Sequence, residues 1–116
     1  MEVQKIALLA CTALCMFSGP ALAQDQARQA SCEAKLVQAQ KLDMLYNIEA
    51  KGHPRIRVLV GPTWYRVAFD AKEGFAQTVN CVAVGGKQDR CTSIDFVDHK
   101  SGRGVATFEN CRLKAQ

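Results

Sequence analysis

The chain has 116 residues, of which 48% are hydrophobic and 22% are charged, with a formal net charge of +4 at pH 7. This composition is typical of a globular domain and excludes a long disordered acidic chain. The excess of basic residues is small and interspersed with acids, so it does not indicate nucleic-acid binding.

Residues 1–23 have the pattern of a secretory signal peptide. A lysine precedes an apolar stretch at residues 6–17, and a small-x-small cleavage site ends at Ala23, before Gln24. The apolar stretch is shorter than the about 20 residues that a membrane-spanning helix needs. We therefore predict a periplasmic or secreted protein without a transmembrane segment after cleavage. The alternative is lipid attachment at Cys11, which would make the chain a structural envelope component.

The remaining residues, 24–116, are predicted to form one small domain stapled by disulfides. Four of the six cysteines follow the cleavage site. An even number of cysteines in an exported chain favours two disulfides, and four cysteines allow three pairings. None of the four belongs to a Cys-x-x-Cys motif, so the sequence indicates neither a thioredoxin-like redox site nor a zinc knuckle.

The first predicted element is an amphipathic helix over residues 31–51, after a polar lead-in at residues 24–30 that is expected to fray. Apolar residues follow one another at spacings of three and four, which places them on one helical face. These residues are Cys32, Leu36, Ala39, Leu42 and Tyr46. Gly52 suits a C-terminal cap, and Pro54 cannot continue the helix.

The next segments predict a hairpin followed by a second helix. Residues 55–60 and 64–69 both alternate between apolar and polar side chains and flank a Gly-Pro-Thr turn. A capping-box pattern at residues 70–73 favours a helix over residues 71–84. An alternative is one long helix over residues 62–84, because the apolar residues of this stretch also fit one helical face.

Residues 91–111 predict the closing hairpin, because two alternating runs flank a short polar loop. Centring that loop places Ile94 opposite Phe108 on an apolar face. The same register places Cys91 opposite Cys111, so it satisfies both the hydrophobic pattern and a disulfide.

The order helix, hairpin, helix, hairpin predicts a two-layer α+β fold with a four-stranded antiparallel sheet and both helices on its apolar face. The disulfide Cys91–Cys111 would close the last hairpin. The remaining pair, Cys32–Cys81, would join the two helices. Residues 112–116 are expected to form a short basic tail.

A basic and aromatic cluster is the candidate binding surface. Arg55, Arg57 and Arg66 fall on the outward face of the predicted first hairpin, and Trp64 lies in its turn. Arginine and tryptophan are enriched at binding hot spots. We therefore expect a non-enzymatic binding module, either an inhibitor or an envelope accessory protein, whose partner is an acidic protein or an anionic envelope polymer.

The alternative function is a small hydrolase or metal-dependent enzyme that uses Asp95, Asp98 and His99. A glycosidase needs two carboxyl groups that flank a cleft, whereas Asp95 is expected on a flat outer sheet face. No further ligand lies two or four residues after either histidine, and no serine lies in a nucleophile elbow. The sequence therefore predicts no enzyme, no cofactor and no metal site.

Overall fold

The computed structural model describes residues 20–50 and 55–116. Its elements are α2 (Pro20–Lys41), β1 (Leu45–Glu49), β2 (Ile56–Val60), the 3₁₀ helix η1 (Pro62–Arg66), α3 (Phe69–Ala83), β3 (Ile94–Asp98), β4 (Gly104–Glu109) and β5 (Arg112–Ala115). The predicted α+β class is confirmed. The first 19 residues of the predicted signal peptide lie outside the described residues, and the predicted mature end at Gln24 lies within α2.

The sheet has five strands in the order β1-β2-β3-β4-β5. Strands β2 and β3 are parallel, and the other neighbouring pairs are antiparallel. The prediction of four antiparallel strands is therefore wrong. A parallel pair requires a crossover connection, which η1 and α3 provide between β2 and β3.

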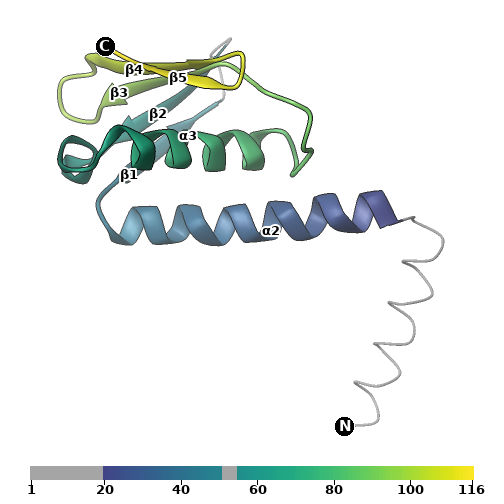
Figure 1. Cartoon of the computed structure of the whole chain (residues 1–116). Helices are drawn as coiled ribbons and strands as arrows, with labels where there is room; N and C mark the ends of the chain where they lie inside the picture. The colour runs from purple at the N-terminus through teal and green to yellow at the C-terminus, as the bar shows by residue number, and fades with distance from the viewer. Residues whose placement is uncertain (1–19, 51–54) are drawn as a thin grey trace, which may run out of the picture.

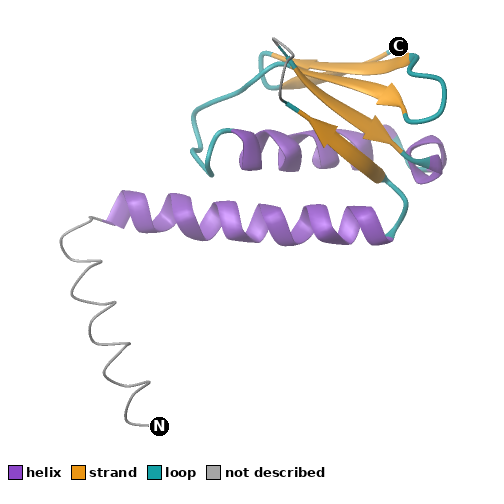
Figure 2. Ribbon diagram, turned by 180° about the vertical axis from the view of Figure 1, so that it is seen from behind, coloured by secondary structure: helices purple, strands orange, loops and turns teal. Residues whose placement is uncertain are grey.

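The helices form two layers below the sheet. Figure 1 shows α3 beneath the sheet and α2 on the far side of α3, and Figure 2 shows the same order from behind. Helix α2 makes most of its contacts with α3 and reaches the sheet mainly at β1. The prediction that both helices pack on the sheet is therefore wrong for α2, which has α3 as its main partner.

The first hairpin pairs β2 with β1, and not with residues 64–69 as predicted. Helix α2 ends at Lys41 because the chain turns through Asp43, which has a φ of 59°. Residues 45–49 then form a strand, although their apolar spacing also continued the helical pattern. The predicted frayed lead-in at residues 24–30 is helical.

Helix α3 confirms the predicted second helix, but its start differs in detail. Val67 and Ala68 are extended and separate η1 from α3, so the long-helix alternative is also wrong. The predicted capping box does not form, because Ala68 is the N-cap residue. Instead, Glu73 accepts a hydrogen bond from the Leu113 backbone N–H at 3.3 Å.

The closing hairpin has the predicted register, with Ile94 opposite Phe108. The predicted tail at residues 112–116 instead folds back as β5, which pairs with β4. The two residues of the turn, Asn110 and Cys111, have φ values of 52° and 65°. Positive φ at both positions is the signature of the type I′ turn that joins tightly paired strands.

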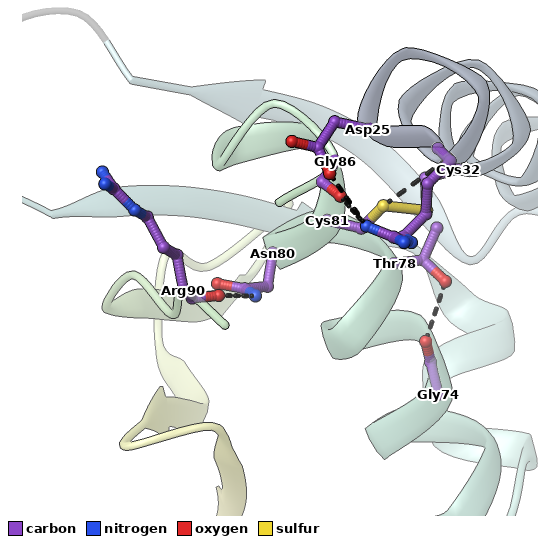
Figure 3. Close-up of a disulfide and its surroundings, with 9 residues drawn as sticks. Asp25, Cys32, Gly74, Thr78, Asn80, Cys81, Gly86 and Arg90 are labelled. Atoms are coloured by element: carbon purple, nitrogen blue, oxygen red, sulfur yellow. Dashed lines mark hydrogen bonds and ion pairs between the residues drawn. A yellow bond between two sulfur atoms is a disulfide. The ribbon is translucent and has the colours of Figure 1, made fainter. Parts of the chain in front are cut away.

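Both predicted cysteine pairs lie at disulfide distance. The Cα atoms of Cys32 and Cys81 are 6.2 Å apart, and those of Cys91 and Cys111 are 5.4 Å apart. Figure 3 shows the first pair joining α2 to α3, with Gly86 beside it. The two pairs are compatible with an oxidising, extracellular environment. None of the helices among the described residues has the length and apolar character needed to cross a membrane.

The centre of the core is aromatic. Trp64 is only 2% exposed, and its ring stacks on Phe96 with the centroids 5.3 Å apart. Phe75 from α3 meets the Trp64 ring edge-on, at a centroid distance of 6.2 Å. Because η1, α3 and β3 each contribute one ring, this cluster fixes η1 against the helix and the sheet.

Candidate functional site

The carboxyl ends of the parallel strands define one edge of the sheet. Val60 and Asp98, the last residues of β2 and β3, are aligned in the parallel register. The segments that leave this edge are η1 and the loop at residues 99–103. In sheets with parallel strands, ligands usually bind beyond the carboxyl ends of those strands, so this edge is the favoured position for a site.

Asp98 organises the loop at this edge. Its Oδ1 accepts a hydrogen bond of 2.7 Å from the Tyr65 hydroxyl. Its Oδ2 accepts bonds from the backbone N–H groups of Lys100 (3.1 Å) and Ser101 (2.9 Å), and from the Ser101 hydroxyl (3.1 Å). These bonds, chiefly that from Tyr65, hold the pKa of Asp98 well below its usual range. Partial burial and then the bond to Asp98 raise the pKa of Tyr65.

A recess of about 420 Å³ opens beside this loop. Its walls carry Trp64 and Tyr65 from η1, Lys72 from α3 and Arg103 from the loop before β4. Its other lining residues are Gly104, Val105, Ala115 and Gln116. The Lys72 Nζ atom lies over the Trp64 ring, 5.3 Å from its centroid, in a cation–π contact. We call this hollow the Lys72–Arg103 recess.

The two cations of the recess are electrostatically available. Within the part of the chain that the structure describes, neither Lys72 nor Arg103 forms an ion pair with a carboxylate. Two cations that are not held in such ion pairs lie beside the same hollow and can attract an anionic group to it. The recess is therefore suited to an anionic group that has an apolar neighbour, since Trp64 and Val105 line it as well.

The predicted arginine surface is divided between the outer face of the sheet and η1. On the outer face, Arg55 Nε lies 3.0 Å from Asp95 Oδ1, and its Nη1 lies 2.7 Å from Glu109 Oε1. Arg57 Nη1 lies 3.7 Å from Glu49 Oε1. The bond to Glu109 raises the pKa of Arg55. Both arginines are therefore already paired with acids of the same face.

The other two predicted residues, Trp64 and Arg66, lie on η1. Trp64 does not occupy a hairpin turn as predicted, because it is packed in the core and only borders the recess. Arg66 is exposed at the end of η1. The structure therefore does not bring the four predicted residues together. Sequence reasoning missed Lys72 and Arg103, which a strand–helix–strand crossover interpretation of residues 56–98 would have placed near one edge.

The three residues of the enzyme alternative make separate contacts. Asp95 is paired with Arg55 on the outer face, and Asp98 is occupied by the loop. His99 Nδ1 donates to the Val60 carbonyl at 2.9 Å, and its ring stacks on Tyr46 at a centroid distance of 4.8 Å. Within residues 20–50 and 55–116, no group of three or more His, Cys, Asp or Glu residues is placed to hold a metal ion.

Comparison with protein families, with curated proteins and with solved structures finds no match for this chain.

Proposed function

We propose that the protein is an exported, non-enzymatic binding module that holds an acidic segment of a partner protein in the Lys72–Arg103 recess. The observation that supports this proposal is the pair of cations without an ion-pair partner among the described residues. In such a role the protein would act as an inhibitor or as an accessory factor of an envelope assembly.

The chemistry of the recess favours a segment in which an acidic residue adjoins an apolar one. The guanidinium of Arg103 offers a planar fork that matches a carboxylate, and Lys72 adds a second positive charge. Trp64, Val105 and Ala115 supply the apolar part of the wall. An anionic polymer with a charge on every unit would leave these apolar walls without a matching group.

The test is a calorimetric titration at low salt with a short peptide in which glutamate residues flank a single phenylalanine. Charge reversal by Lys72→Glu with Arg103→Glu is expected to weaken binding by at least about tenfold, or about 1.4 kcal/mol. Two controls accompany it. Lys87→Glu, in the exposed loop after α3, carries the same type of charge change away from the recess. A serine-for-glutamate peptide lacks the acidic groups.

The results separate the possible partners. Unchanged affinity of the double variant for the acidic peptide would refute the recess as the binding site. If dextran sulfate binds and the peptide does not, the partner is an anionic polymer and the proposed protein partner is wrong. Loss of affinity in Lys87→Glu as well would indicate attraction by net charge alone.

A further inference from the structure

A second hollow, of about 300 Å³, lies between the two helices. Helix α2 contributes Lys35 and Ala39 to its lining, Leu42 follows the end of α2, and α3 contributes Ala71 and Phe75. These spacings of three and four place each set on one face of its helix. We call this hollow the interhelical groove. Figures 1 and 2 show α2 and α3 lying side by side.

The groove differs in character between its two ends. Lys35 and Thr78 lie at the end near the Cys32–Cys81 bridge, and Leu42 and Met44 lie at the other end. Lys35 is the one charged residue among the described residues that line the groove, and no ion pair of Lys35 occurs among them. Leu42 lies seven positions after Lys35, which corresponds to about 10 Å along the axis at the rise of an α-helix.

The far end of the groove leaves apolar surface uncovered. Leu42 is 64% exposed, whereas Met44 and Phe75 beside it are buried. An apolar chain laid along the groove would cover Leu42 and touch the side chains of Ala39 and Ala71. Removing this surface from water favours binding, and the small alanine side chains leave room for the chain.

We propose that the interhelical groove binds an anionic single-chain amphiphile of medium length, such as a fatty acid, with its carboxylate at Lys35 and its alkyl chain directed towards Leu42. One cation at one end matches one head group, and the apolar remainder matches one chain. The hollow lies at the low end of the roughly 300–1,000 Å³ typical of small-ligand pockets, and it is about twice the size of a cavity that holds benzene.

The groove is separate from the Lys72–Arg103 recess. Thr63 and Val67 line the groove, whereas Trp64 and Tyr65 line the recess, so η1 and the segment after it lie between the two hollows. A helical peptide is a poorer occupant of the groove, because such ligands usually anchor through several apolar side chains over two turns or more. The proposal therefore does not depend on the proposed acidic partner.

The test titrates the disulfide-bonded protein with decanoate, and separately with uncharged decanol, below the concentrations at which they aggregate. Calorimetry is expected to show saturable binding of one decanoate per chain. Lys35→Glu is expected to weaken decanoate binding about three- to tenfold and to leave decanol affinity unchanged. Lys41→Glu, on an exposed residue of α2 outside the lining, is the matched control and is expected to change neither affinity.

A blocking variant tests the position of the chain. Ala71 is exposed on α3, so Ala71→Trp is expected to fill the groove and abolish the binding of both ligands while the far-ultraviolet circular dichroism stays unchanged. Amide chemical shifts of the unmodified protein provide a second measurement that needs no variant. They are expected to change with decanoate at Ala39, Leu42 and Ala71, and not at Arg103.

Several results would overturn the proposal. These are absence of saturable decanoate binding, shift changes outside the groove, or equal weakening of decanol by Lys35→Glu. If the protein is a dimer that Ala71→Trp dissociates, a second copy covers the groove instead of an amphiphile. An acidic helical peptide that binds there when decanoate does not would assign the groove to a protein partner.

Discussion

The two disulfides are expected to contribute unequally to stability, because they close loops of different length. Cys32 and Cys81 are separated by 49 residues, and Cys91 and Cys111 by 20 residues. Loop-closure entropy predicts that the longer bridge contributes about 4 kcal/mol and the shorter about 3 kcal/mol, with a difference of about 0.8 kcal/mol. Cys32 is also buried, so its replacement removes packing in addition to the cross-link.

The assay is urea unfolding of two double-alanine variants, one for each bridge. Trp64 is the only tryptophan and is buried among Phe75 and Phe96, so its fluorescence reports directly on the core. The Cys32→Ala, Cys81→Ala variant is expected to lose more unfolding free energy than the Cys91→Ala, Cys111→Ala variant. The slopes of the two unfolding curves show whether the denatured states remain comparable.

A larger loss from the shorter bridge would refute the loop-closure argument. The two contributions together, about 7 kcal/mol, are comparable with the whole stability of a small domain, which is about 5–15 kcal/mol. Removal of both bridges is therefore expected to leave a chain that is at most marginally folded. A stable, cooperatively folded chain without either bridge would show that the α2–α3 packing needs no staple.

Three further predictions concern two glycines and the loop carboxylate. Gly74→Ala is expected to stabilise the protein by about 1 kcal/mol, since a Cβ there meets nothing within 4 Å in the middle of α3. Gly61→Ala is expected to destabilise the protein by about 2 kcal/mol or more, because its Cβ would collide with the Asp43 carbonyl. The same urea assay measures the unfolding free energy of both glycine variants. Unchanged stability of Gly61→Ala would contradict that contact. The depressed pKa of folded Asp98 means that the unfolded chain binds more protons just below the ordinary pKa of 3.8, so stability is expected to fall as the pH drops through this range. Asp98→Asn is expected to make the melting temperature depend less on pH in this range. An unchanged pH dependence would show that Asp98 does not cause the loss of stability.

Local patterns predicted the hairpin of β3 and β4 but not the strands β1 and β5. The alternation of apolar and polar residues around one short loop predicts the register of Ile94 with Phe108. The same register places Cys91 opposite Cys111. The apolar spacing of residues 45–49 fits both a helix and a strand, and it also continues the pattern of the preceding helix. The turn at Asp43 ends that helix, so these residues form β1 instead. The turn at Asn110 could have been predicted from the sequence, since asparagine readily adopts positive φ.

The candidate site could not be predicted in the same way, because it depends on pairing between distant strands. The strand assigned to residues 64–69 placed Arg66 beside Arg57 on one outward face. Parallel pairing of β2 with β3 instead moves η1 to the end of the sheet, and antiparallel pairing of β2 with β1 places Arg57 beside Glu49. Lys72 and Arg103 come together only through that crossover, and nothing in their local sequence indicates it.

The 3₁₀ helix η1 is the segment on which both proposed binding sites depend. Its Trp64 side is fixed by stacking on Phe96, and the Thr63 N–H donates to the Asp43 carbonyl at 3.1 Å. The Thr63 hydroxyl also donates to the Leu42 carbonyl, which ties η1 to the end of α2. One rigid turn therefore presents Tyr65 to the recess and Thr63 to the groove. Because the η1 wall of each hollow is held by the core and by the α2–β1 connection, this wall is formed by the packing of the fold before any ligand binds, which lowers the entropy cost of binding.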